Sequence, residues 1–338
     1  MPISKTTQKV TIGLLAVPES SAAVIYGLHE VFSCVGTIWE GLTGQKTQSR
    51  EMRPLIIAET TETIITKLKV PIAPDATFTD QARMDVIIIP DLFIEPDKQA
   101  NWYSAINWLN SQREKGAVIC SVCTGSLLLA QTGLLDGREA TTHWSASKTF
   151  KIHHPKVDLK IERVLVPSGP EHGIITSGGS ASWTDLSLYL IARFCGEEEA
   201  RRIAKIFLFG DHSQGQLPFA AMVRPRQHTD ATISKCQTWI ADHYDVTNPV
   251  AEMTTLSGLN PRTFKRRFHA STGYKPIDYV QSLRIEEAKH ALETTIDTID
   301  DISEQVGYED GSSFRRLFKR LVGISPNEYR RRYRYTKI

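Results

Sequence analysis

The sequence predicts two domains, an α/β domain with a parallel sheet followed by an all-α domain. Three observations support this. Apolar runs of strand length alternate with helical stretches through the first two-thirds of the chain. Strand-like runs stop beyond residue 229, and a 50-residue repeat follows within the helical part. A chain of 338 residues is also too long for one compact core, which agrees with two domains.

The α/β domain begins with a continuous apolar run at 10–17, as expected of a strand that is buried on both faces. The run MDVIIIP at 84–90 predicts another buried strand, and the Asp-Gly pair at 136–137 ends a predicted helix. Further strands are predicted at 53–58, 117–122 and 173–177, and helices at 22–33, 101–115, 126–135 and 182–194. Strands and helices that alternate in this way predict a parallel sheet with helices on both faces.

The domain boundaries follow from a change in composition. Residues 209–229 combine Gly, Pro, Gln and His with little periodicity, which is typical of a linker. We therefore expect an α/β domain at 1–208, a linker at 209–229 and a helical domain at 230–338. In the helical domain we expect helices at 230–244, 249–257, 260–271, 276–292, 298–306, 310–321 and 325–333.

The helical domain contains an internal repeat. Five landmark residues recur at an offset of 50, namely Phe264, Phe268, Gly273, Pro276 and Tyr279, followed by Phe314, Phe318, Gly323, Pro326 and Tyr329. Each copy is preceded by a short helix that ends in glycine, so each copy predicts a helix-turn-helix. Asn260 with Pro261, and Asp310 in the second copy, are the expected N-caps of the second helices.

The second helix of each copy is predicted to bury its two phenylalanines, because residues four positions apart share one helix face. The opposite face then carries basic and small polar side chains, which suit contacts with base edges and phosphates in the major groove. These candidate DNA contacts are Arg262, Thr263, Lys265 and Arg266 in the first copy, and Ser312, Ser313, Arg315, Arg316 and Lys319 in the second.

The charge distribution supports this interpretation although the formal net charge is only +2. Residues 262–275 carry five basic residues and no acid, and residues 310–338 carry nine basic and two acidic residues. One basic helix is more often a solvated surface. Two basic helices at the same place of a repeated unit favour nucleic-acid binding.

The closing stretch G-Y-E-D-G-S-S-F-R-R-L-F-K-R-L-V-G-I-S-P-N-E-Y-R at 307–330 is similar to the signature of the AraC/XylS family of transcription regulators. The resemblance covers residues 229–333. It implies that the third and sixth helices of the domain bind double-stranded promoter DNA, and that the protein is an activator with RNA polymerase as a partner. Gly311 departs from the family pattern: the matching position reads a base in the family, and a glycine has no side chain to contact one.

The stretch Ile-Cys-Ser-Val-Cys-Thr-Gly-Ser at 119–126 predicts a strand, a sharp turn and a helix. This is the layout of a nucleophile elbow, with Cys123 at the bend. A thiol at a helix N-terminus can have a lowered pKa. Catalysis would also need a base within hydrogen-bond reach, and His143 is the candidate.

Together with A-T-T-H-W at 140–144 and the Gly178-Gly179 turn, the elbow resembles the class I glutamine-amidotransferase-like, PfpI-type superfamily. The resemblance implies a flavodoxin-like fold with an effector pocket lined by Glu19, Cys123, Thr124, His143, Trp144 and Gly179. Three residues depart from the family pattern. Thr124 replaces the histidine that follows the nucleophile in the peptidases, Val24 replaces an acid, and Asp91 replaces a glycine.

Cys123 therefore has three interpretations: a residue that lines a sensor pocket, an inert structural residue, or a catalytic nucleophile. We expect a regulator rather than an enzyme, with no catalytic residue and no cofactor. Its expected effector is an amino acid or a quaternary amine, and its expected state a homodimer. The alternatives are a cysteine-dependent hydrolase or amidotransferase-like enzyme fused to a DNA-binding domain, and an architectural DNA binder that needs no ligand.

The expected location is the cytoplasm, associated with the nucleoid. No apolar run approaches membrane-spanning length, and the N-terminal stretch MPISKTTQKV lacks the apolar core of a secretory signal. Five cysteines without framework spacing indicate reduced thiols. His153-His154 lacks partners at ligand spacing, so we expect no metal site.

Overall fold

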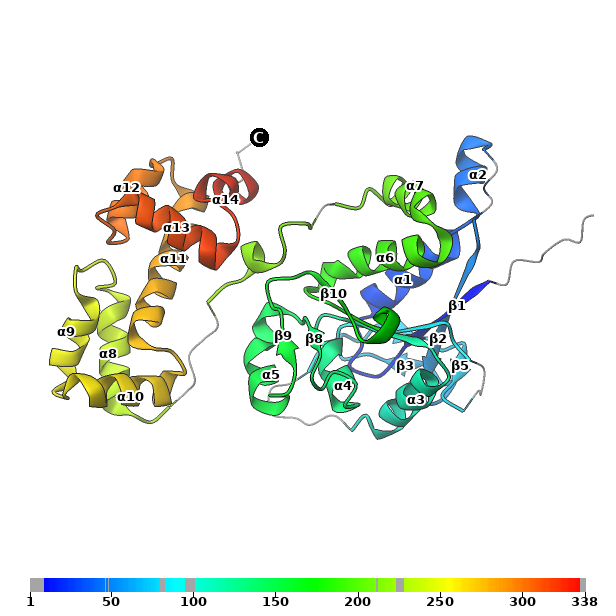
Figure 1. The fold of residues 1–338 in the computed structure, drawn as a ribbon, viewed down its shortest axis with the longest axis horizontal. Helices are drawn as coiled ribbons and strands as arrows, with labels where there is room; N and C mark the ends of the chain where they lie inside the picture. The colour runs from blue at the N-terminus through cyan, green and yellow to red at the C-terminus, as the bar shows by residue number, and fades with distance from the viewer. Residues whose placement is uncertain are drawn as a thin grey trace, which may run out of the picture. The chain divides into compact units, whose positions relative to one another are not determined.

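The computed structural model describes residues 9–45, 47, 49–79, 83–94, 101–210, 212–222 and 228–334. The chain divides into two compact units, Met1–Gln216 and Leu217–Ile338 (Figure 1). This division falls inside the segment 209–229 that the sequence predicts as a linker. Positions 211 and 223–227 of that segment, and the chain ends at 1–8 and 335–338, lie outside the described residues.

The first unit is built on a seven-stranded sheet with the strand order β10-β11-β7-β6-β1-β2-β5. The sheet strands are β1 Val10–Leu15, β2 Met52–Ala58, β5 Ala76–Thr77, β6 Val86–Ile89, β7 Val118–Val122, β10 Leu165–Ser168 and β11 Ile174–Ser177. Two short pairs accompany it, β3 Ile64–Ile65 with β4 Pro71–Ile72, and β8 Glu139–Ala140 with β9 Asp158–Leu159. All neighbours in the large sheet are parallel except β10 and β11.

Helices cover both faces of this sheet, as predicted. The helices are α1 Ala22–Cys34, α2 Ile38–Thr43, α3 Tyr103–Glu114, α4 Gly125–Gln131, α5 Ser147–His153, α6 Trp183–Cys195 and α7 Glu197–Phe207. Alternate residues of the central strand β6 point to opposite faces: Val86 and Ile88 pack with α1 and α6, whereas Ile87 and Ile89 pack with α3 and α4. The α/β fold class is confirmed.

Several features differ from the prediction. Helices α2 and α5 were not predicted, and α4 ends at Gln131 rather than at the predicted residue 135. Strand β10 runs antiparallel at the sheet edge, because only the short turn Pro170–His172 separates it from β11 and a short connection joins antiparallel strands. Helix α7, for which no element was predicted, follows α6 almost directly and is amphipathic, burying Ala200 and Ile203 against the core.

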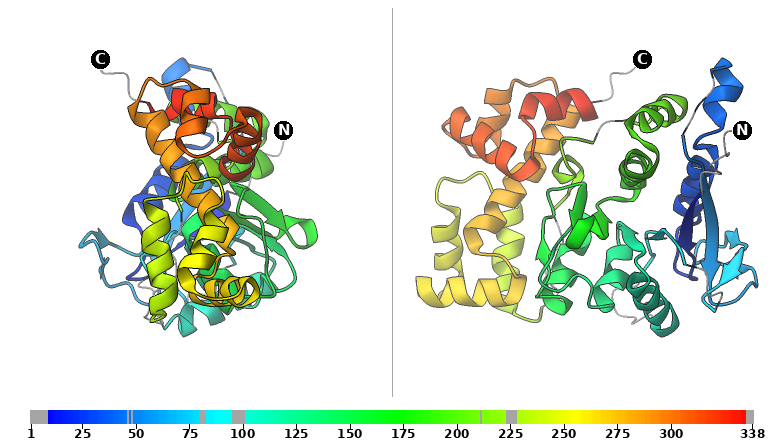
Figure 2. Two further views of the ribbon diagram at one scale, coloured as in Figure 1. Left: turned by 90° about the vertical axis from the view of Figure 1, so that its left-hand side faces the viewer. Right: turned by 45° about the vertical axis from the view of Figure 1, so that its right-hand side comes forward.

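The second unit is helical throughout its described residues, apart from loops and turns. Its helices are α8 Ala231–Ala241, α9 Pro249–Ser257, α10 Pro261–Thr272, α11 Pro276–Thr294, α12 Ile299–Gln305, α13 Gly311–Val322 and α14 Pro326–Tyr333. They form two clusters with separate apolar cores, one with α8–α10 and one with α12–α14. The long helix α11 belongs to both cores and joins them (Figure 2).

Several features concern the whole described chain. No helix among the described residues is long and apolar enough to cross a membrane. All five cysteines are free thiols. Among the same residues, no group of three or more His, Cys, Asp or Glu side chains could hold a metal ion.

Candidate nucleic-acid interface and ligand site

Helix α10 is fixed by its N-cap and by two buried rings. Asn260 Oδ1 accepts a hydrogen bond from the Thr263 N–H at 2.9 Å, and Pro261 occupies the first helical position. Phe264 and Phe268 are fully buried, with ring centroids 5.5 Å apart. The predicted cap and the predicted buried face are both confirmed, so the opposite face is directed to solvent.

Helix α13 repeats this arrangement with a stronger cap. The Asp310 carboxylate accepts hydrogen bonds from the N–H groups of Ser312 and Ser313, each at 3.0 Å. The Ser313 hydroxyl and these N–H groups hold the pKa of Asp310 below its ordinary value. Phe314 and Phe318 are fully buried, as predicted.

The predicted DNA contacts lie away from the apolar cores. The exposed members are Arg262, Lys265, Arg266, Ser312, Arg315, Arg316 and Lys319. Thr263 and Ser313 are partly buried, because both belong to the capped first turns. The Ser313 hydroxyl donates to Asp310 Oδ2 at 2.6 Å and accepts from Arg316 Nη2 at 3.0 Å. Contact of these side chains with DNA stays a prediction.

Arg267 belongs to the basic stretch at 262–275 but has a structural role. Its guanidinium binds both carboxylate oxygens of Asp230 at 2.5 and 3.0 Å. Asp230 also caps α8 by accepting the N–H of Ile233 at 3.1 Å. Arg267 therefore ties α10 to α8, and part of the basic stretch serves the fold.

The buried Arg284 of α11 links the two clusters of the second unit. Its guanidinium donates to the carbonyls of Tyr244 at 2.6 Å and Val246 at 2.8 Å, both in the loop between α8 and α9. It also donates to the carbonyl of Gly307, in the turn of the second helix-turn-helix, at 2.9 Å. One side chain thus fixes the first copy against the second.

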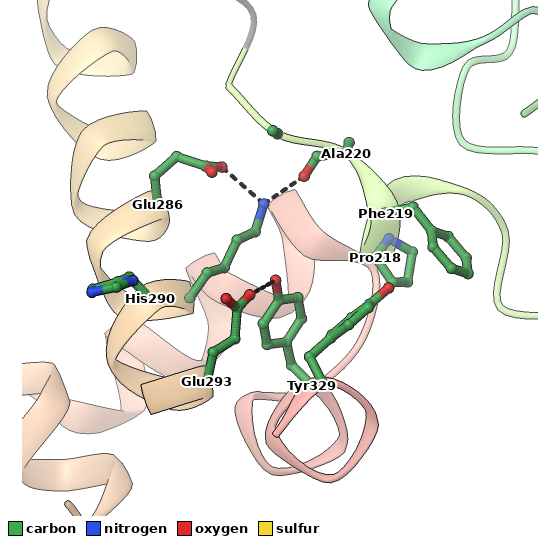
Figure 3. A pocket seen from close by; sticks show the side chains of 10 residues that line it. Pro218, Phe219, Ala220, Glu286, His290, Glu293 and Tyr329 are labelled. Atoms are coloured by element: carbon green, nitrogen blue, oxygen red, sulfur yellow. Dashed lines mark hydrogen bonds and ion pairs between the residues drawn. The ribbon is translucent and has the colours of Figure 1, made fainter. Parts of the chain in front are cut away.

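A cavity of about 350 Å³ lies within the second unit (Figure 3). The buried Lys289 donates to the Ala220 carbonyl at 2.6 Å and pairs with Glu286 at 2.8 Å. The Tyr329 hydroxyl donates to Glu293 at 2.7 Å. The lining is completed by Pro218, Phe219, Ala221, His290 and Tyr333. Lys289 therefore fastens the segment around Ala220 to helix α11.

In the first unit, the chain makes a strained turn at Cys123, whose φ is 54°. The Cys123 N–H donates to the carbonyl of Ser177 at 2.9 Å, and its own carbonyl accepts from the Ser126 hydroxyl at 2.7 Å. A glycine is required at position 125, because a Cβ there would collide with the Pro90 carbonyl oxygen. The nucleophile-elbow geometry predicted from the sequence is present.

Polar groups from neighbouring loops gather at this edge, where the carboxyl ends of β1, β6, β7 and β11 meet. Asp91 is buried, and its Oδ2 accepts from the Ser180 hydroxyl at 2.9 Å. Burial raises the pKa of Asp91, and the hydroxyls of Ser180 and Ser21 oppose that rise. Glu19 accepts from Trp102 Nε1 at 3.4 Å. Carboxyl groups therefore line this edge from two loops.

The other predicted pocket residues lie in the same region. The Thr124 hydroxyl accepts the Leu92 N–H at 2.9 Å and donates to the Leu92 carbonyl at 2.7 Å. The rings of His143 and Trp144 are 5.0 Å apart. Gly179 lies beside His143, whose ring would be 3.9 Å from an added Cβ.

The thiol is not activated. Burial and the neighbouring Asp91 raise the pKa of Cys123 to about 12, so the lowered pKa that a helix N-terminus can cause is not found here. His143 Nδ1 lies 2.6 Å from Ser145 Oγ, and burial lowers the pKa of this imidazole. In the described part of the chain no hydrogen bond joins Cys123 to His143. A thiol with a raised pKa and no hydrogen bond to His143 is not arranged as an activated nucleophile.

We expect Cys123 in the native protein to react slowly with iodoacetamide. With a pKa of about 12, its thiolate fraction at pH 8 is about one in ten thousand. The rate should rise about tenfold for each pH unit, because only the thiolate reacts. Cys34, which is partly exposed, is the internal reference in a mass-spectrometric time course. Labelling of Cys123 ahead of Cys34 at neutral pH would contradict the burial and the raised pKa of the Cys123 thiol.

Gln216 is a structural residue that the sequence analysis missed. It was predicted to lie in the linker, but it is only 3% exposed within the first unit. Its Nε2 donates to the Thr142 carbonyl at 2.8 Å, and its Oε1 accepts the Trp144 N–H at 3.2 Å. Gly178 leaves the space that this amide occupies. The Thr142 hydroxyl in turn donates to the Cys123 carbonyl at 3.2 Å, so Gln216 is connected to the elbow.

Comparison with known protein families identifies both units. Residues 253–332 match the family model described as a helix-turn-helix domain. Residues 40–192 match the DJ-1/PfpI family. The two matches fall on either side of the division between the units.

Similar sequences come from bacteria. The HTH-type transcriptional regulator GlxA of Rhizobium meliloti is 28% identical over 245 residues, which cover 70% of this chain and 72% of the relative. The HTH-type transcriptional regulator CdhR of Pseudomonas aeruginosa is 28% identical over 243 residues, 67% of this chain and 66% of the relative. For CdhR, the aligned region thus spans just under two thirds of its length.

Among solved structures, a protein from Vibrio parahaemolyticus is similar over 60% of this chain and all of its own length. The TM-score is 0.50 at 18% sequence identity. At this identity the similarity shows the fold alone.

Proposed function

We propose that this chain is an activator controlled by a small-molecule effector. The premise is that it belongs to the AraC-type helix-turn-helix transcription regulators with a DJ-1/PfpI-family domain ahead of the DNA-binding domain. Its helical unit binds promoter DNA. The similar curated proteins are regulators, which confirms the prediction of a regulator rather than an enzyme. The effector assignment rests mainly on the buried polar edge around Cys123.

We assign DNA recognition to α10 and α13. Each helix presents a capped N-terminus and a basic outer face, the arrangement that suits insertion into the major groove. The proposed contacts are Arg262, Thr263, Lys265, Arg266, Ser312, Ser313, Arg315, Arg316 and Lys319. Arg284 ties the two copies together, and we propose that they enter successive major grooves, about 34 Å apart, on one face of the duplex.

Replacing Arg266 or Arg316 by alanine is expected to weaken operator binding by about 1–3 kcal/mol each, if each arginine contacts a base. Both side chains are exposed, so the fold should not change. A mobility-shift titration of the full-length protein on its promoter duplex measures the change.

Lys235→Ala is the matched control for these two variants. Lys235 is also an exposed cation of the second unit, but it lies on α8 rather than on a recognition helix. We expect its loss to change affinity little. Arg266→Ala and Arg316→Ala proteins that bind as tightly as Lys235→Ala would contradict the assignment of α10 and α13.

The proposed effector site is the carboxyl edge of the sheet, lined by Glu19, Cys123, Thr124, His143, Trp144 and Gly179. Asp91 joins this set, because its Oδ1 is buried without a hydrogen-bond partner in the described chain. The buried carboxyl group of Asp91 and the partly buried one of Glu19, which accepts from the Trp102 ring, favour a ligand with an amine or quaternary ammonium group. Amino acids and quaternary amines are therefore the effector classes we propose.

A thermal-shift screen of amino acids and quaternary amines tests this site. A ligand at 100 times its Kd should stabilise the folded protein by about 2.7 kcal/mol. Asp91→Asn should reduce the shift. Promoter regulation that survives in Cys123→Ala would exclude a catalytic role for the thiol. If no compound shifts the transition, a DNA binder that needs no ligand becomes the better interpretation.

Regulation requires that the effector favour one arrangement of the protein over another. Two anchors support a role for the connecting segment: Gln216 is buried in the first unit, and Ala220 is tied to Lys289 in the second. We further propose a homodimer, with RNA polymerase as a partner in the cytoplasm, associated with the nucleoid. Sedimentation of the full chain tests the dimer, which a monomer at micromolar concentration would contradict.

A further inference from the structure

The two recognition helices are not equivalent. Arg315 of α13 occupies the place of Lys265 in α10. Arg315 Nη2 binds Asp300 Oδ1, from helix α12, at 2.7 Å. The first copy has Ala251 where the second has Asp300, and within the described residues Lys265 has no ion pair. Only the second recognition helix therefore holds a basic side chain against a carboxylate from the preceding helix.

Gly311 is part of the same arrangement. A Cβ at this position would lie 2.6 Å from Asp300 Oδ1 and 3.0 Å from Arg315 Nη1. Both distances are too short for an ordinary contact. The glycine that offers no side chain to a base thus provides the space in which the Asp300–Arg315 pair forms.

We propose that Asp300 is a positioning residue that holds the Arg315 guanidinium for recognition of a guanine, and that Gly311 leaves the space for this pair. The inference rests on the DNA-binding function proposed above. Arginine reads guanine through two parallel hydrogen bonds to O6 and N7. The guanidinium carries five N–H donors in a fixed plane, so binding to Asp300 through Nη2 leaves donors for a base.

The exposure of the pair supports a role in recognition rather than in folding. The side chains of Arg315 and Asp300 are 44% and 67% exposed. Exposed ion pairs contribute little to stability, because water screens them and two long side chains lose freedom. Holding Arg315 in one orientation before DNA arrives instead lowers the entropic cost of the base contact. The carboxylate also repels phosphates on any duplex, and only a site with the guanine contact offsets this repulsion.

Selection from a randomised duplex library with the full-length protein tests this proposal. The variants are Arg315→Ala, Asp300→Ala and Gly311→Ala, and the last adds a Cβ that forces the ends of the Asp300 and Arg315 side chains to shift. We expect the wild-type protein to prefer guanine at one position by about tenfold or more. All three variants should lose that preference at the same position and keep the others, and Asp300→Ala should not weaken binding to a scrambled duplex.

Glu304→Ala is the matched control, because Glu304 is an exposed acid on the same helix as Asp300, whereas the ion pair of Arg315 in the described structure is with Asp300. It should keep the guanine preference. The proposal is overturned if Asp300→Ala keeps the preference, with or without tighter binding, or loses it at a position different from that of Arg315→Ala. A wild-type protein that selects no sequence would instead refute the DNA-binding assignment itself.

Discussion

Replacing Phe318 by alanine is expected to unfold the second helix-turn-helix and to abolish specific DNA binding. Phe318 is fully buried, and its ring centroid lies 5.7 Å from that of Phe314 and 5.6 Å from that of Tyr329. A buried Phe-to-Ala change costs about 3–5 kcal/mol, because it leaves a cavity that the neighbours fill only in part. Urea unfolding followed by hydrogen exchange measures the loss and locates it.

The loss should stay within the core that contains Phe318. That core is formed by α11–α14 and is separate from the core of α8–α10. Leu321→Ala, a change on the same helix at a residue that is 38% exposed, is the control and should cost much less. If hydrogen exchange in Phe318→Ala rises in α8–α10 as much as in α11–α14, the two cores are not separate.

Replacing Arg284 by methionine is expected to destabilise the second unit by about 3–5 kcal/mol, because each hydrogen bond to a charged group is worth about 1.5–3 kcal/mol and the losses are not additive. Methionine keeps much of the side-chain volume but removes the donors to the carbonyls of Tyr244, Val246 and Gly307. Denaturant titration measures the destabilisation. Binding to a full operator should fall more than binding to a half-site, because the two copies lose their common support.

Arg284→Lys is the informative comparison. Lysine keeps the charge but lacks the planar fork, so it cannot satisfy three carbonyls as arginine does, and we expect an intermediate stability. Equal losses of full-site and half-site binding in Arg284→Met would show that Arg284 serves stability alone and does not set the spacing of the recognition helices.

Much of the fold was predictable because its signals are local. The buried strand at 84–90 is a continuous apolar run, and Asn260 and Asp310 are cap residues at the start of amphipathic helices. The repeat located α10 and α13, since the same pattern of buried and basic residues occurs twice at one spacing. These signals depend on neighbours in sequence, so one chain is enough to detect them.

The missed features depend on residues that are distant in sequence. Gln216 is an ordinary polar residue in a segment rich in glycine and proline, and only the fold brings it to Thr142. The raised pKa of Cys123 comes from burial and from Asp91, neither of which its own stretch of sequence reveals. Likewise, the reason why position 311 is a glycine becomes visible only once the fold places Asp300 beside it.

The tie between Lys289 and Ala220 has a practical consequence for dividing this protein. A truncation that starts at residue 230, as the sequence composition suggests, would remove Ala220 and leave the buried ammonium group with one partner fewer. A truncation that starts at Leu217 keeps this bond. The complementary fragment that ends at Gln216 keeps the hydrogen bond from the Gln216 side-chain amide to the Thr142 carbonyl. For an isolated DNA-binding fragment, Leu217 is therefore the better first residue.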